Sequence, residues 1–192
     1  LANTGSGKTA AFLIPMINKV IVDRKNKCLI IVPTRELAMQ IQDELRSLSQ
    51  NTGIRNLLVI GGNSIGMQIS QLQRNPEFVI CTPGRLKDLI QRKAIILNKF
   101  NNVILDEVDR MLDMGFINDI KLIIEQISQE RQSLFFAATM NKKAEELANT
   151  LLTNPVKIQT ETQSPGKNVD QDVIRLEKGQ SKLDVLLELL SE

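Results

Sequence analysis

The chain contains no histidine, and it has only two cysteines among its 192 residues. A zinc site, or a Ser-His or Cys-His catalytic pair, would therefore lack its usual nitrogen partner. Any catalysis must depend on carboxylates, lysine, arginine and a bound metal ion. Cys28 and Cys81 both lie in apolar runs, which predicts buried thiols rather than a disulfide. So few cysteines suit a reducing compartment, and we expect a cytoplasmic protein.

Long apolar segments and aromatic side chains are also scarce. No apolar run reaches the roughly 18 residues of a membrane span, so we expect no membrane partner. Six phenylalanines are the only aromatic residues, and the net charge is only +2. The chain thus lacks the base-stacking platform of many single-strand binders. If it binds nucleic acid, we expect it to contact the backbone, without sequence preference.

A phosphate-binding pattern occupies the first residues, Ala2-Asn3-Thr4-Gly5-Ser6-Gly7-Lys8-Thr9. Closely spaced glycines let backbone N–H groups surround a phosphate chain, and the following helix points its positive end at the same anion. Lys8 is placed to reach the β- and γ-phosphates, and the Thr9 hydroxyl to bind Mg²⁺. Ala2 stands where the general pattern G-x-x-x-x-G-K-[ST] has glycine. The buried strand that normally precedes such a loop is not in the sequence.

Apolar runs alternate with helical patterns along the rest of the chain. We expect strands at 28–32, 56–60, 78–81, 103–105 and 133–136, with helices between them. The first helix shows Ala10, Ile14, Ile17 and Ile21 along one face, and Thr34, Ser64 and Asn141 stand at expected helix starts. This alternation predicts an α/β fold, a doubly wound and mainly parallel sheet with helices on both faces. Ligands bind such sheets at the carboxyl ends of the strands.

The composition changes near the C-terminus. Residues 160–168 are polar and contain Pro165-Gly166, which predicts a linker between a domain at 1–159 and a segment at 169–192. That last segment has a strand-like stretch at 172–176 and a helix with leucines on one side. It is too short for a core, so we expect it to be the beginning of a second domain.

Asp106-Glu107 directly follows one of the predicted buried strands. Asp106 is well placed to hold the Mg²⁺ that Thr9 also binds, and Glu107 to orient or deprotonate an attacking water. Two acids after an apolar run are often only a solvated strand end. Together with the phosphate loop and the order of the elements, they predict a nucleoside triphosphatase.

These residues also resemble a known family. The chain is similar to the first RecA-like domain of DEAD-box ATP-dependent RNA helicases over almost its whole length. The family's loop form is A-x-x-G-x-G-K-T, which Ala2 satisfies. The other matching motifs are Pro33-Thr34-Arg35-Glu36-Leu37-Ala38, Gly61-Gly62, Thr82-Pro83-Gly84-Arg85, Asp106-Glu107-Val108-Asp109 and Ala137-Ala138-Thr139.

The resemblance implies a role for each matching residue. ATP phosphates would be bound by Ala2, Asn3, Thr4, Gly5, Ser6, Gly7, Lys8 and Thr9. Thr9 and Asp106 would hold Mg²⁺, and Glu107 would position the hydrolytic water, with Asp106 and Lys8 completing the catalytic set. The backbone of one RNA strand would contact Thr34, Arg35, Gly62, Thr82, Gly84 and Arg85. Plain solvated surface charge is the alternative for both arginines.

Three departures limit what the resemblance implies. Val108 replaces alanine at a packing position, where we expect the chemistry to survive. Ala137 replaces serine and removes a hydroxyl that in the family bonds the last acid, here Asp109. Thr139 remains as a partner for Asp109, and these two residues are expected to couple ATP use to strand separation. The upstream Q motif that reads adenine and the complete second domain with its arginine finger are absent.

Because an arginine finger is worth ~10³–10⁵ in rate, the chain alone is expected to bind ATP but hardly hydrolyse it. We also expect an unpaired sheet edge where the missing strand would lie, so the sequence is either an excerpt or completes its sheet with a strand from elsewhere. Two alternatives stay open. One is a DNA translocase with a related ATPase core, and the other is an RNA clamp with weak or uncoupled hydrolysis.

Overall fold

A computed structural model describes residues 7–159, 173–176 and 179–190. Its elements in chain order are α1 (Lys8–Val22), β1 (Cys28–Ile31), α2 (Arg35–Leu48), β2 (Asn56–Val59), α3 (Ile65–Leu72), β3 (Phe78–Cys81), α4 (Pro83–Gln91), a 3₁₀ turn (Leu97–Lys99), β4 (Asn102–Leu105), α5 (Val108–Asp113), α6 (Ile117–Glu125), β5 (Gln132–Phe135), α7 (Lys142–Leu151) and α8 (Lys182–Leu189).

The strands of the described residues form one parallel sheet in the order β2-β3-β1-β4-β5. Leu29 of β1 lies between Val79 of β3 and Val103 of β4, so the register aligns the strand ends on one edge. The three central strands are completely buried, as continuous apolar runs predict for a sheet covered on both faces.

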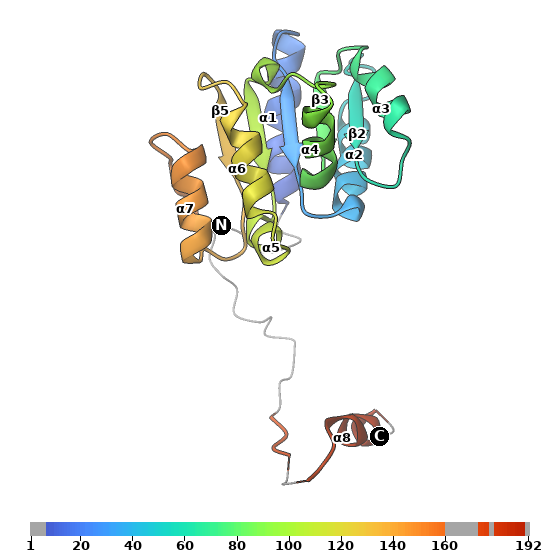
Figure 1. The fold of residues 1–192 in the computed structure, drawn as a ribbon, viewed down its shortest axis with the longest axis vertical. Helices are drawn as coiled ribbons and strands as arrows, with labels where there is room; N and C mark the ends of the chain where they lie inside the picture. The colour runs from blue at the N-terminus through green and yellow to red at the C-terminus, as the bar shows by residue number, and fades with distance from the viewer. Residues whose placement is uncertain (1–6, 160–172, 177–178, 191–192) are drawn as a thin grey trace. The chain divides into compact units, whose positions relative to one another are not determined.

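Helices cover both faces of the sheet, as Figure 1 shows. Alternate residues of each strand point to opposite sides and divide the core into two apolar clusters. One cluster packs Phe12 and Leu13 of α1 and Ile41 of α2 against the sheet. The other packs residues of α4, α5, α6 and α7, among them Leu89 and Ile123. The predicted α/β fold with a mainly parallel sheet is confirmed.

Local start signals were predicted well. Thr34 accepts a hydrogen bond from the Leu37 N–H at 3.2 Å, and Asn141 accepts one from the Ala144 N–H at 2.9 Å. Both side chains thus cap their helices. Four of the five predicted strands differ from the observed ones by one residue at one or both ends, and 78–81 is correct. The thiols Cys28 and Cys81 are buried and free, as predicted, and burial raises the pKa of both.

The apolar face predicted for α1 is only partly correct, because, of its isoleucines, Ile17 alone is buried. Ile14 and Ile21 are 56% and 48% exposed, whereas Phe12, Leu13, Met16, Ile17 and Val20 are buried. The helix is apolar on most sides, so periodicity alone does not identify the side that packs against the sheet.

The chain divides into two units, Leu1–Glu161 and Thr162–Glu192. The linker predicted at 160–168 lies outside the described residues, so the domain division stays a prediction. The strand predicted at 172–176 is absent from its described residues, because 173–176 contain no strand. A strand needs a neighbouring strand to pair with, and the sheet of the described residues consists of β1 to β5. The helix predicted in this segment is present as α8, and Leu183, Leu186 and Leu187, together with Leu190 at its C-cap, are exposed.

Both edges of the sheet are open among the described residues. β5 pairs with β4 alone, and β2 pairs with β3 alone. A groove of about 640 Å³ borders the free edge of β5 and is lined in part by Leu134 and Phe136. Among the described residues, no helix has both the length and the apolar character needed to cross a bilayer.

Candidate functional site

The predicted phosphate loop leads directly into α1. Gly7 is the N-cap residue of this helix and adopts φ 80°, a left-handed conformation that favours glycine. Lys8 and Thr9 form the first turn, where backbone N–H groups have no helical acceptor and attract anions. The remaining loop residues, Ala2, Asn3, Thr4, Gly5 and Ser6, lie outside the described residues.

Asp106 follows β4 and is only 3% exposed. Its backbone N–H donates to the Ile31 carbonyl at 3.1 Å, and its Oδ1 accepts the Glu107 N–H at 2.9 Å. Burial raises the pKa of this carboxyl, while the hydrogen bond from Glu107 and the charge of Lys8 oppose the increase. A nearby cation would stabilise the charged form of this buried carboxylate.

Glu107 has a left-handed backbone, with φ 51° and ψ 49°. Such a conformation costs an L-residue about 1–2 kcal/mol, and strained residues of this kind cluster at functional sites. The Glu107 carbonyl accepts the Met111 N–H at 3.0 Å, and its carboxylate pairs with Arg110 at 3.2 Å. Sequence reasoning missed both Arg110 and the strain. The three-residue spacing of Glu107 and Arg110 was the available signal for the pair.

Asp109 joins the α5 helix to the loop after β5. Its Oδ2 accepts hydrogen bonds from the Thr139 hydroxyl at 3.0 Å, the Thr139 N–H at 2.8 Å and the Ala138 N–H at 3.2 Å. The predicted Thr139 contact is therefore present. Ala137 is buried in the apolar core. It has no hydroxyl to donate, but Asp109 Oδ2 still has three donors from Ala138 and Thr139.

A second group of predicted residues lies in a groove at the carboxyl ends of the strands, on the same side of the sheet as Asp106. The groove has a volume of about 540 Å³ and is lined by Pro33, Thr34, Arg35, Glu36, Gly61, Thr82, Gly84, Arg85, Asp88, Met114 and Phe116. Five of the six residues predicted to contact a nucleic-acid backbone thus come together, from the ends of the two strands β1 and β3. Gly62 lies in a neighbouring groove instead. Glu36 belongs to a matching motif but was given no role, and Asp88, Met114 and Phe116 were not predicted because they belong to none of the matching motifs.

Two arginines of this groove hold the loop between β2 and α3. Arg35 Nη1 donates to the Gly61 carbonyl at 3.4 Å, and Arg85 Nη1 donates to the Asn63 carbonyl at 3.0 Å. Gly62 between these anchors has φ 87°, and a Cβ there would lie 2.7 Å from Arg35 Nη1. Both arginines are therefore built into the groove rather than only solvated at the surface.

The residues around Asp106 fit a magnesium nucleotide. Mg²⁺ prefers oxygen ligands, which the buried Asp106 carboxylate and the Thr9 hydroxyl supply. The positive charge of Lys8 lowers the pKa of Asp106, against the effect of burial, so the loop lysine acts electrostatically on the acid at the end of β4. The start of α1 adds N–H groups for phosphate oxygens.

The sequence is similar to known proteins. A profile of the DEAD/DEAH box helicases matches residues 1–147. DEAD-box ATP-dependent RNA helicase CshA of Bacillus subtilis is 41% identical over 192 residues, which are 98% of this chain and 38% of that protein. ATP-dependent RNA helicase DBP3 of Lodderomyces elongisporus is 43% identical over 199 residues, 100% of this chain and 37% of that protein. The chain thus spans about two fifths of the length of these relatives.

Solved structures give the same result. A hypothetical ATP-dependent RNA helicase from Sulfolobus tokodaii superimposes with a TM-score of 0.73 and 38% identity, covering 80% of this chain and 44% of that one. A DEAD box protein from Methanococcus jannaschii superimposes with a TM-score of 0.75 and 40% identity, covering 80% and 42%. The fold is that of a RecA-like helicase domain. The chain belongs to the DEAD/DEAH box helicase family.

Proposed function

We propose that this chain is the first RecA-like domain of an ATP-dependent RNA helicase that opens short duplexes locally. The observation that carries the proposal is that two groups of predicted residues lie together at the carboxyl ends of the strands. The acids Asp106 and Glu107 follow β4, and the groove residues Thr34 and Arg35 follow β1, the adjacent strand. The names of the relatives cited above support the same activity.

The residues divide the work between phosphate and water. The N-terminus of α1 and Lys8 bind the ATP phosphates, and Thr9 with Asp106 holds Mg²⁺, which when bound neutralises charge on the phosphate oxygens. Glu107 orients the attacking water and accepts its proton. Arg110 pairs with the Glu107 carboxylate in this structure and so fixes its direction before substrate binds.

The groove around Arg35 and Arg85 grips the sugar-phosphate backbone of one RNA strand. Guanidinium groups and helix N-termini bind phosphate without reading bases, so binding is independent of sequence. Gly84, at the start of α4, has nothing within 4 Å of its missing Cβ, which leaves room for a close backbone approach. Asp109 and Thr139 link the ATP side to the loop after β5 and couple hydrolysis to strand separation.

A second helicase domain in the same protein completes the ATP and RNA sites. The share of the relatives that this chain spans supports it. An arginine finger from that domain contributes ~10³–10⁵ in rate, so the chain alone binds ATP and RNA but turns over very slowly. The buried free thiols of Cys28 and Cys81 suit action in the cytoplasm.

The test compares nucleic acids and variants in the protein that carries both domains. We expect RNA to stimulate ATP hydrolysis, DNA to stimulate it much less, and Lys8→Ala to abolish it. Equal stimulation by DNA would favour a translocase. Turnover without strand separation would favour an RNA clamp and contradict the helicase proposal.

A further inference from the structure

A second groove runs along the open edge of β2 and has no role in the function proposed so far. It has a volume of about 740 Å³, and α2 and α3 supply its walls. Gln42 and Arg46 come from α2, and Met67 and Gln71 come from α3. We call it the β2-edge groove. The strand residues that line it, Arg55 to Leu58, span about 10 Å at about 3.3 Å per residue, and Gly62, Asn63 and Ser64 continue the lining.

Unpaired backbone groups form the floor of this groove. The carbonyls of Arg55 and Val59 accept hydrogen bonds from β3 and its flanking residues, so they face the sheet. Because strand residues alternate, Asn56 and Leu58 turn their N–H and C=O groups to the open side. Neither N–H has a hydrogen-bond partner among the described residues.

The charge of the groove has one sign. Its lining includes Arg46, Arg55 and Arg74, and no aspartate or glutamate belongs to the lining among the described residues. Arg46 makes an exposed pair with Asp43 at 3.6 Å, a kind of contact that holds an arginine weakly. The groove therefore presents a positive surface suited to a polyanion.

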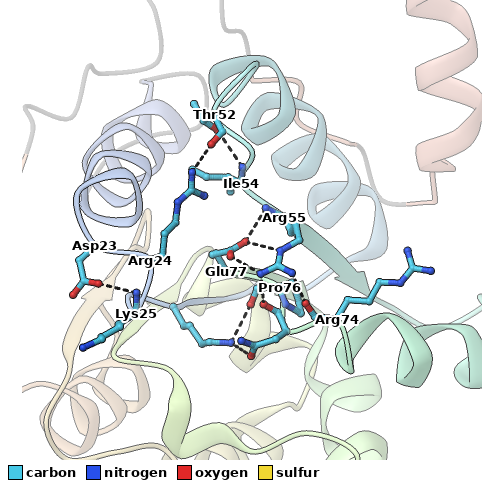
Figure 2. A network of polar contacts seen from close by, with 11 residues as sticks. Asp23, Arg24, Lys25, Thr52, Ile54, Arg55, Arg74, Pro76 and Glu77 are labelled. Carbon is cyan, nitrogen blue, oxygen red and sulfur yellow. Dashed lines mark hydrogen bonds and ion pairs between the residues drawn. The ribbon is translucent and has the colours of Figure 1, made fainter.

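Arg55 and Arg74 differ in what holds them, as Figure 2 shows. Arg55 is fixed by Glu77, with Nη2 to Oε1 at 2.8 Å and its backbone N–H to Oε2 at 2.8 Å. Its Nη1 also donates to the Arg74 carbonyl. The Arg74 side chain extends away from this cluster and makes no hydrogen bond or ion pair with any described residue. Arg74 is thus available to a ligand, whereas Arg55 serves the structure.

The β2-edge groove is continuous with the groove proposed for RNA. Gly62, Asn63 and Ser64 line the β2-edge groove, and Arg85 of the other groove donates to the Asn63 carbonyl and to Gln68 Oε1 at 3.1 Å. Gln68 in turn donates to the Ile60 carbonyl at 3.0 Å. One hydrogen-bonded chain of residues therefore borders both surfaces.

We propose that the β2-edge groove extends the RNA-binding surface, so that the strand held by Arg35 and Arg85 continues past Gly62 along β2. Arg74 and Arg46 bind phosphates of these additional nucleotides, and the N–H groups of Asn56 and Leu58 offer further donors. The inference rests on the proposed RNA binding. An extended acidic peptide that pairs with β2 is the competing occupant. Continuity with the Arg35 and Arg85 groove favours RNA.

The test measures RNA affinity of the protein that carries both domains against salt concentration by fluorescence anisotropy. The probes are oligouridylates of about 6 and about 12 nucleotides, within the range of single-strand sites. The variant is Arg46→Gln with Arg74→Gln. The matched control is Lys25→Gln with Lys121→Gln, which removes the same charge from exposed residues that do not line the groove. Circular dichroism and thermal melting check that both fold.

We expect the groove variant to weaken binding of the longer probe about fivefold per arginine at about 0.1 M salt and to reduce its logarithmic salt slope by about 1.4, or 0.7 per phosphate. The shorter probe and the control variant should keep wild-type values. An unchanged slope for the longer probe, with wild-type binding intact, would overturn the inference and leave the proposed function standing. Failure of the wild-type protein to bind either probe would overturn the proposed function itself.

A separate titration tests the peptide alternative. A short extended peptide of alternating glutamate and valine is titrated against the wild-type protein and the groove variant. Binding that requires Arg46 and Arg74, combined with an unchanged RNA slope, would assign the groove to a protein partner and reject RNA. Absence of peptide binding, together with the reduced RNA slope, supports the inference.

Discussion

Gly62→Ala tests how the loop after β2 organises the RNA groove. Gly62 has φ 87°, and an added Cβ would lie 2.7 Å from Arg35 Nη1. Two penalties follow from one methyl group. The left-handed backbone costs an L-residue about 1–2 kcal/mol, and Arg35 must move away and lose its 3.4 Å contact with the Gly61 carbonyl.

The magnitudes can be separated. Movement of a flexible side-chain end is cheap, and a long hydrogen bond is worth at most about 1 kcal/mol, so the free energy of unfolding should fall by about 1–3 kcal/mol. For a domain of this size that lowers Tm by about 2–4 °C per kcal/mol. Displacing Arg35 removes one phosphate contact, so RNA affinity should fall about fivefold at about 0.1 M salt.

Gly61→Ala is the matched control for this experiment. It adds the same methyl group one residue earlier, where φ is not positive and the nearest Arg35 atoms lie 3.9 Å away. Thermal melting and RNA anisotropy are measured for both variants. The reasoning is refuted if the two variants have the same Tm and the same RNA affinity.

Three further predictions concern other parts of the domain. Gly84→Ala should stabilise α4 by about 0.5–1 kcal/mol, because the added Cβ meets nothing within 4 Å. It should nevertheless weaken RNA binding, and unchanged RNA affinity would show that the RNA backbone does not pass close to Gly84. Burial opposes ionisation of Glu77, but hydrogen bonds from Arg55 outweigh it and lower the pKa of the carboxyl, so Glu77→Gln should cost about 1–3 kcal/mol at neutral pH. Because the lowered pKa gives stability that is lost as pH falls, melting curves of Glu77→Gln and wild type should converge at acid pH, and a gap independent of pH would contradict this. Thr139→Val removes one of three donors to Asp109 and should reduce strand separation per ATP hydrolysed in the two-domain protein while ATP affinity stays unchanged.

The parts of the fold that depend on short-range signals could be predicted from the sequence. Continuous apolar runs located the buried strands, and Thr34 and Asn141 marked helix starts because their side chains accept local N–H groups. The packed side of α1 could not be predicted in this way. Its apolar residues surround most of the helix, and the position of the sheet, a long-range property, buried Phe12 rather than Ile14.

The candidate site shows the same division. Motif spacing pointed to Asp106, Glu107 and five of the residues that line the Arg35 and Arg85 groove, but not to Asp88, Met114 or Phe116. It did not reveal the left-handed backbone of Glu107, because the residues on either side are held by distant segments: the Asp106 N–H donates to the Ile31 carbonyl and the Val108 N–H to the Phe136 carbonyl. The anchoring of Arg35 and Arg85 on the loop around Gly62 also depends on residues far apart in the sequence.

RNA-stimulated ATP hydrolysis by Glu107→Gln in the protein with both domains tests the central claim most directly. Glutamine keeps the shape of the side chain but cannot accept the proton of the attacking water. The account predicts that the variant still binds ATP and RNA and that stimulated turnover is lost. Wild-type turnover by this variant would contradict the assignment of the site.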